Sequence, residues 1–165
     1  MSAARTAFAA HGTELEIRSV AADAGVGVGT VFRNFPTKQQ LVEAMAREWA
    51  AERDEALLRC LSVGDPWEAV VGHVRWCGEI MSREPGLRRL LTDVSAKAHL
   101  AGETDAAFVE GLAELIVRAQ GARVLRPGVT AAGYYGLLVG LAVALSAGSD
   151  WRTMTDVIIS GLRAP

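Results

Sequence analysis

The chain has 165 residues, half of them hydrophobic and 22% charged, with a formal net charge of −2. This length allows one compact unit with a sizeable core, and the composition excludes an intrinsically disordered chain. Because there is no overall positive field, any affinity for nucleic acid has to come from a local surface. Cys60 and Cys77 are too few for a disulfide framework, so we expect a reducing, cytoplasmic setting.

The N-terminal part of the chain is predicted to form three short helices. The first covers residues 3–10, and the second covers residues 17–24, where apolar residues recur at i, i+3, i+4 and i+7 before Gly25. The third covers residues 28–35 and ends before Pro36. Alanine and leucine abound and alternating β-branched runs are missing, so an all-α fold is expected.

Capping residues and helix-breaking prolines and glycines divide the remaining sequence into six further predicted helices. Thr37 and Gln40 form a capping-box pattern that begins a long helix toward Leu61. Asp65 and Pro66 are typical of the start of a fifth helix. The fifth helix runs to the break at Pro85-Gly86, and the last four are predicted over residues 87–95, 104–120, 130–147 and 150–162. About nine helices are therefore expected.

The stretch Gly128–Ser149 contains no charged residue, and about 20 apolar residues can span a bilayer. Five glycines lie within it or at its ends, and no basic cluster flanks it. A helix buried in an interface is the preferred interpretation, with a membrane span as the alternative.

Residues 17–35 have the pattern of a helix-turn-helix, two short helices joined by a glycine turn. The leading edge of the second helix of this motif is almost bare of bulk, so it fits a DNA major groove. Thr30 and Arg33 can bind base edges or phosphates, and Lys38 lies in a first helical turn that favours a phosphate. The predicted DNA-binding residues are Gly27, Val28, Gly29, Thr30, Phe32, Arg33, Asn34 and Lys38. The alternative is a plain three-helix unit with a solvated surface.

The run of residues 24–38 resembles the pattern A-G-V-[SG]-x-G-T-[LV]-[YF]-x-[HYN]-F-x-[ST]-[KR] of the TetR family of transcriptional regulators. The resemblance implies that the third helix enters the major groove and that the positions of Phe32 and Lys38 contact the DNA backbone. Phe32 stands where tyrosine is usual, Asn34 where histidine is commoner and Val28 where lysine is frequent. The basic N-terminal arm typical of the family is short or missing.

This resemblance predicts a helix-turn-helix DNA-binding domain over residues 1–46 and a ligand-binding and dimerisation domain over residues 47–165. Residues 1–48 contain five basic and five acidic side chains. Because the salt dependence of DNA binding scales with roughly 0.9 per neutralised phosphate, we expect modest affinity that is less sensitive to salt than usual.

Polar residues among the apolar ones of the body predict a small-molecule site. His73, Trp76, Cys77 and Met81 fall within about two turns of one predicted helix. Partners from later segments complete the predicted ligand-binding set, namely His99, Phe108 and Leu112. The family resemblance implies that occupation of such a pocket spreads the two DNA-binding heads of a dimer. Alternatives are ordinary core packing, a metal shared by His73 and Cys77, and redox sensing by Cys77.

Small residues recur along one side of the predicted helix 130–147, at Gly133, Gly136, Gly140 and Ala144. Glycine costs helix stability, so this stripe indicates the close approach of another helix. The resemblance implies a homodimer interface made by the last two helices, with Leu137, Trp151, Met154 and Ile158 beside the stripe. A contact within one chain is the alternative.

The resulting hypothesis is a homodimeric, ligand-responsive repressor that binds a palindromic DNA operator and is released by a small, largely apolar molecule. A ligand-sequestering or partner-binding helical protein with a weakened DNA head is the alternative. An enzyme is not expected, because no nucleophile–base pair, phosphate loop or metal set has usable spacing, and no cofactor is expected.

Overall fold

The computed structural model describes residues 1–92 and 104–165, and all the regular structure in these ranges is helical except for one isolated β-bridge between Leu125 and Arg163. The head contains α1 (Ser2–His11), a short 3₁₀ turn η1 (Gly12–Glu14), α2 (Ile17–Asp23) and α3 (Val28–Asn34). The body follows with α4 (Lys38–Leu61), α5 (Pro66–Arg83), α6 (Pro85–Thr92), α8 (Thr104–Gly121), α9 (Ala131–Ser146) and α10 (Trp151–Leu162). The expected all-α fold is confirmed.

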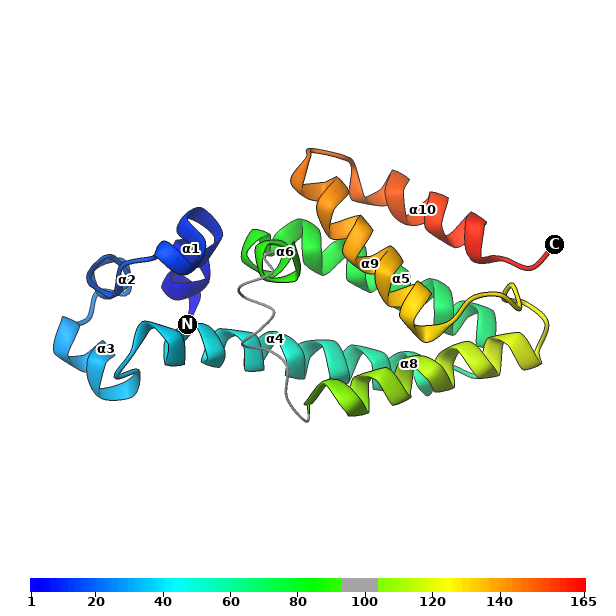
Figure 1. Cartoon of the computed structure of the whole chain (residues 1–165), viewed down its shortest axis with the longest axis horizontal. Helices are drawn as coiled ribbons and strands as arrows, with labels where there is room; N and C mark the ends of the chain where they lie inside the picture. The colour runs from blue at the N-terminus through cyan, green and yellow to red at the C-terminus, as the bar shows by residue number, and fades with distance from the viewer. Residues whose placement is uncertain (93–103) are drawn as a thin grey trace.

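The helices form an elongated molecule with the head at one end (Figure 1). The long helix α4 runs from the head into the body, where it lies beside α8, and α9 and α10 cover the opposite side of α5. The predicted domain boundary after residue 46 falls inside α4, so the division into two functional domains stays a proposal.

Two hydrophobic cores correspond to the two ends of the molecule. The head core joins Phe8 of α1 and Leu15 to the first half of α4, where Met45 and Trp49 are buried. The body core joins the rest of α4 to α5, α8, α9 and α10. Leu87 of α6 packs against both cores, so α6 lies between head and body.

The helix boundaries follow the local signals that the sequence contains. The Thr37 hydroxyl accepts a hydrogen bond from Gln40 N while the Gln40 side chain accepts one from Thr37 N, which completes the predicted capping box. Asp65 accepts from the amides of Trp67 and Glu68 at the start of α5. The helix predicted over residues 87–95 begins earlier, at Pro85, because proline suits a first helical turn.

The uncharged stretch before Ser149 forms α9, which has only 16 residues. Among the described helices, none has the length and apolar character that a bilayer crossing requires. The membrane interpretation of this stretch therefore receives no support.

Candidate DNA-binding head and effector core

The turn between α2 and α3 has the geometry of a helix-turn-helix. Gly25 has φ 65°, a left-handed conformation that residues with a Cβ avoid. The amide of Val26 donates to the carbonyl of Ala21 at 3.0 Å, which closes the end of α2. Gly27 is extended and directs the chain into α3. The chain therefore changes direction at Gly25, as the sequence predicts.

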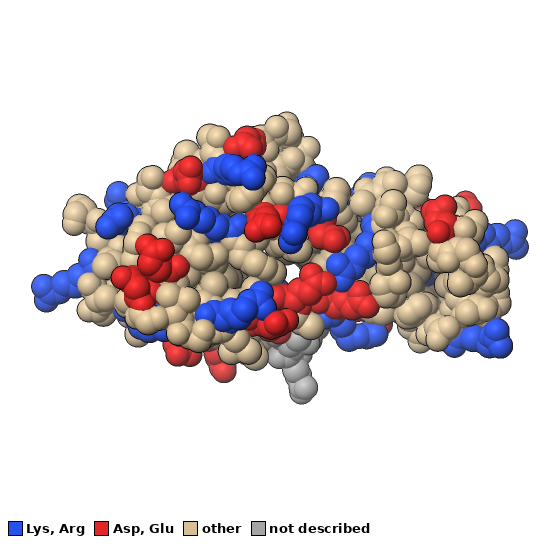
Figure 2. All heavy atoms as spheres, turned by 180° about the vertical axis from the view of Figure 1, so that it is seen from behind, with Lys and Arg blue, Asp and Glu red and all other residues tan. Residues whose placement is uncertain are grey.

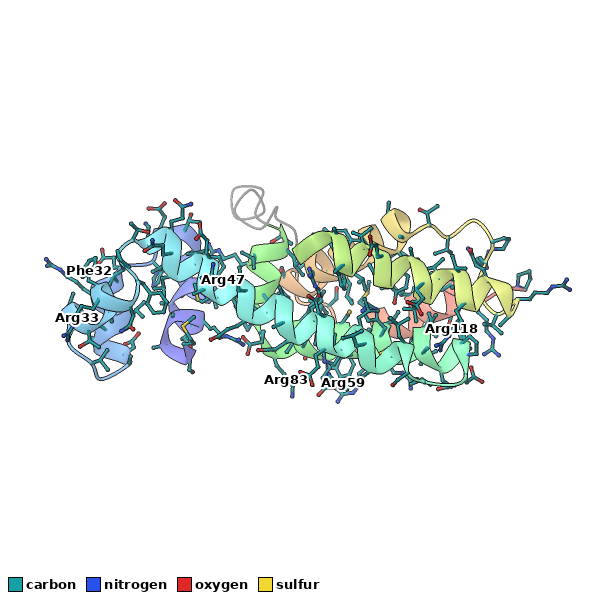
Figure 3. The ribbon with its side chains drawn as sticks, turned by 90° about the horizontal axis from the view of Figure 1, so that it is seen from below. Phe32, Arg33, Arg47, Arg59, Arg83 and Arg118 are labelled. Carbon is teal, nitrogen blue, oxygen red and sulfur yellow. The ribbon has the colours of Figure 1, made fainter. Side chains whose placement is uncertain are left out.

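The predicted DNA-contacting residues are exposed, apart from Thr30, which is half-buried. Phe32 is 45% exposed although it is aromatic, and it lies with Arg33 at the end of the molecule (Figure 3). A Cβ added at Gly29 would meet nothing within 4 Å, and one at Gly27 would meet only the Thr30 hydroxyl, at 3.8 Å. The leading edge of α3 is therefore bare, as a groove-binding helix requires.

The polar side chains of α3 are held along their own helix. Arg33 donates to the carbonyl of Gly29 at 3.3 Å and to the Thr30 hydroxyl at 3.4 Å. The Asn34 amide donates to the carbonyl of Thr30 at 2.8 Å. These bonds are exposed to water, so a DNA base or phosphate can replace them at little cost.

Lys38 is exposed at the first position of α4, directly after the capping box. The first free amides of a 24-residue helix and the lysine charge together favour a phosphate at this point. The basic and acidic side chains of the head balance, so the head carries no net positive charge. On the face shown in Figure 2, uncharged atoms cover most of the head, whereas acidic and basic side chains mix over the body.

The most deeply buried polar contact of the described body joins α5 to α9. Nδ1 of His73 lies 2.9 Å from the hydroxyl oxygen of Tyr134, and Nε2 lies 3.9 Å from Sγ of Cys77. One neutral tautomer satisfies both contacts, with the Tyr134 hydroxyl donating to Nδ1 and the Nε2 proton directed at the sulfur. His73 has no exposed surface.

Burial decides the protonation of these groups. Desolvation lowers the pKa of His73 to about 4, and it raises the pKa values of Cys77 and Tyr134. All three are therefore uncharged near pH 7. Cys77 is a buried thiol rather than an activated thiolate, which argues against the redox alternative.

The other residues of the predicted ligand-binding set are packed into the body core. Met81, Phe108 and Leu112 are buried and Trp76 is half-buried, while His99 lies outside the described residues. The guanidinium carbon of Arg53 lies 3.8 Å from the ring centroid of Phe108. Within the described ranges, no three histidine, cysteine or acidic side chains gather as a metal site would require.

A surface groove of about 460 Å³ lies away from this set, between α1, α4 and the α5–α6 junction. Its most buried cation is Arg5, which pairs with Glu48 at 3.0 Å, Glu52 at 2.8 Å and Glu84 at 3.6 Å. Since Glu84 follows α5, this cluster ties the N-terminal half of α1 to the body.

The predicted dimer face is exposed at its glycines. Gly133, Gly136 and Gly140 are exposed, and a Cβ at either of the last two would meet nothing within 4 Å. Leu137 is 42% exposed. In contrast, Trp151, Met154 and Ile158 are partly buried against the body core, and Ala144 is half-buried. Close approach at the glycines is therefore not made within this chain's described residues.

Sequence reasoning missed Tyr134 as the partner of His73, and it missed the arginines that bind helix ends. Arg118 donates to the carbonyls of Leu61, the last residue of α4, and of Val63 beyond it. No local signal marks the contacts of Arg118, because the partners are 57 and 55 residues away.

A helix-turn-helix head on an otherwise helical body defines the class of DNA-binding transcriptional regulators. Residues 1–45 match the family model described as bacterial regulatory proteins of the tetR family, and residues 65–164 match the C-terminal domain of SbtR-like transcriptional regulators.

Similar proteins agree with these matches. The transcriptional repressor KstR of Mycolicibacterium smegmatis is 37% identical over 97 residues, which cover 55% of this chain and 46% of that repressor. A TetR regulatory protein from Mycobacterium vanbaalenii is 32% identical, with a TM-score of 0.67 over 99% of this chain and 92% of that one. The fold is also shared by AibR, solved with isovaleryl coenzyme A and operator DNA, at 20% identity, a TM-score of 0.78 and coverage of 99% and 95%.

The chain belongs to the TetR family of transcriptional regulators. It is therefore a transcriptional regulator of a family that is not enzymatic. The family expected from residues 24–38 is confirmed.

Proposed function

We propose that the protein is a cytoplasmic homodimer that binds a palindromic operator through α3 and dissociates from it when a small, largely apolar effector binds the body. The observation that carries this proposal is the exposed leading edge of α3, where a Cβ at Gly29 would meet nothing within 4 Å and one at Gly27 would meet only the Thr30 hydroxyl. Thr30 and Arg33 would read base edges, and Lys38 would bind a phosphate.

The proposed dimer forms through the glycine stripe of α9, with α10 beside it. An exposed helix face of glycine and Leu137 gains stability when a second helix covers it, because close backbone approach brings many atoms into contact. Dimerisation would place two α3 helices roughly 34 to 36 Å apart, or a multiple of this spacing, for successive major grooves.

The proposed effector site lies around His73, Tyr134 and Phe108. This region is apolar apart from a few directional groups, which suits an acyl chain ending in a polar carbonyl. AibR was solved with isovaleryl coenzyme A, and we propose an acyl thioester whose acyl chain is the small, largely apolar group that enters this region. Because His73 is fully buried here, the effector would have to bind a conformation in which α5 and α9 separate, and so shift the population away from the DNA-binding state.

Operator binding is tested by fluorescence anisotropy with DNA from upstream of the protein's own coding sequence, at two salt concentrations. Arg33→Ala should reduce specific affinity by about 1–3 kcal/mol and relax base preference at one position. Arg59→Ala is the matched control, since Arg59 is an exposed arginine of the body paired with Glu55. Equal affinity of the native protein for this DNA and for random duplex would refute the proposal.

Effector binding is tested on the protein–operator complex by adding isovaleryl-CoA or longer acyl-CoA, with free coenzyme A as the control. Release by the thioesters alone supports the proposed class. Unchanged anisotropy with every acyl-CoA would exclude this class of effector while leaving operator binding intact.

The neutral charge of the head favours one alternative, a helical ligand-binding protein whose DNA contacts have weakened. It predicts that the operator titration shows no preference over random duplex although the free protein binds acyl-CoA.

A further inference from the structure

Two adjacent arginines of α6 bind the C-terminal ends of two different helices. Arg88 Nη1 donates to the carbonyls of Met81 at 2.5 Å and Ser82 at 3.5 Å, in the last turn of α5. Arg89 Nη1 donates to the carbonyls of Ala9 at 3.0 Å and Ala10 at 2.9 Å, in the last turn of α1. Successive side chains leave a helix about 100° apart, so one short helix can hold both partners.

The chemistry of these contacts is specific to helix ends. The last carbonyls of an α-helix have no partner within the helix and carry the negative end of its dipole. A guanidinium satisfies these carbonyls with charge-assisted hydrogen bonds and brings a compensating positive charge. Arg88 does this for a helix of the body, and Arg89 does it for the first helix of the head.

The end of α1 is shaped around the Arg89 side chain. Gly12 caps α1 with φ 59° and is buried. A Cβ at Gly12 would lie 2.8 Å from Nε of Arg89 and 3.2 Å from its Cζ. The close approach of the arginine is therefore possible because this position has no side chain.

The rest of α6 is also shared between head and body. Leu90 belongs to the head core, and α6 packs against both α1 and α9. A Cβ at Gly86 would lie 3.1 Å from the Trp49 ring and 3.2 Å from the carbonyl oxygen of Arg5. A displacement of α6 against α5 or α9 would therefore also displace α1.

We propose that Arg89 is a positioning residue: it fixes the orientation of the DNA-binding head on the body by holding the C-terminal end of α1 to α6, while Arg88 anchors α6 to α5. Arg89 is an exposed residue, so its contribution to overall stability is small. Its contribution to the orientation of the head is larger, because one planar guanidinium holds two consecutive carbonyls of α1. The effect on operator affinity rests on the proposed function, whereas the orientation of the head does not.

The orientation of the head is measured by double electron–electron resonance, as the distance distribution between spin labels at Asp23→Cys in α2 and Arg75→Cys in α5. The background is Cys60→Ser, Cys77→Ala, and labelled chains are diluted with unlabelled chains so that one chain supplies both labels. Arg89→Met should broaden or shift the distance distribution with little change in the thermal midpoint. Arg89→Lys, which keeps a cationic donor, should restore part of the native distribution.

Arg88→Met is the matched control, since it removes the neighbouring arginine from the same helix. It should lower the thermal midpoint and leave the distance distribution narrow, because α6 stays packed on α9 and, through Leu87, on both hydrophobic cores. A native distribution in Arg89→Met, or an equal change in both methionine variants, overturns the inference.

With operator DNA, Arg89→Met should bind at least about fivefold more weakly, the lower end of a typical coupling between sites. If the distance distribution changes as expected but no variant, including the native protein, prefers operator over random DNA, the inference holds and the proposed function fails.

Discussion

Nδ1 of His73 lies 2.9 Å from the hydroxyl oxygen of Tyr134, and this single contact joins α5 to α9 across 61 residues of sequence. Both partners are buried, and their rings are also close, with centroids 5.7 Å apart. The pair therefore combines a directional hydrogen bond with apolar packing. The contribution of the hydrogen bond to stability can be separated from that of the packing by experiment.

The first prediction concerns acid stability. Burial lowers the pKa of His73 to about 4 from its ordinary value of 6.5. Between these values the unfolded chain binds a proton and the folded chain does not, so stability is lost as pH falls from about 6.5 toward 4. The loss approaches roughly 3 kcal/mol, at about 1.4 kcal/mol per pKa unit. Urea unfolding at a series of pH values across this range should show the fall in unfolding free energy.

The control for this prediction is His73→Gln, which cannot be protonated in this range. The difference in unfolding free energy between the native protein and the variant should shrink as the pH is lowered. Parallel curves for the two proteins would mean that His73 does not cause the acid sensitivity.

The second prediction concerns the tyrosine hydroxyl. Tyr134→Phe leaves the ring in place but removes the hydrogen-bond partner of a buried imidazole nitrogen. We expect a loss of about 1–3 kcal/mol, because an unsatisfied buried polar group costs its desolvation energy. Tyr135→Phe is the neighbouring control, where the side chain is partly exposed to water and the loss should be smaller. Equal losses at the two positions would contradict the assignment.

The third prediction concerns the crossing of α5 and α10. A Cβ at Gly78 would lie 2.5 Å from Cγ2 of Thr155 and 3.0 Å from the Trp151 ring. Gly78→Ala should therefore destabilise the fold by about 1–3 kcal/mol, as overpacking does, despite the better helix propensity of alanine. Thermal or urea unfolding measures this change.

Gly72→Ala provides the comparison within the same helix, because its Cβ would meet only Sγ of Cys60 at 3.8 Å, an ordinary contact. This variant should be neutral or more stable, by up to about 1 kcal/mol. A destabilised Gly72→Ala together with an unaffected Gly78→Ala would show that the α5–α10 contact is less close than described.

The fourth prediction concerns the proposed dimer. Gly140→Gln places a longer polar side chain on the open stripe of α9, where nothing of the described chain lies within 4 Å of the new Cβ. The monomer fold should be retained, whereas the dimer should dissociate at higher protein concentration than the native one. Sedimentation velocity measures this. Gly121→Gln, at the equally open end of α8, is the control. An unaltered dimer in Gly140→Gln would place the interface elsewhere.

Local signals predicted the helices and their ends well. Thr37 with Gln40, Asp65 with Pro66 and Gly25 each act on neighbours within four residues, so their effect can be read from a short window of sequence. The family assignment followed from one ordered run, residues 24–38, and is confirmed. The residues assigned to DNA, effector and dimer contacts stay predictions, although the structure exposes the α3 set and the glycine stripe.

The sequence by itself determined an all-α chain, a helix-turn-helix at residues 17–35 and the TetR family, because helix caps, glycine turns and apolar periods are local. Only the tertiary structure decided which distant groups meet. Tyr134 is 61 residues from His73 and Arg89 is 80 from Ala9. Such contacts depend on how whole helices pack, and packing is set by the shape of both surfaces together rather than by any one segment.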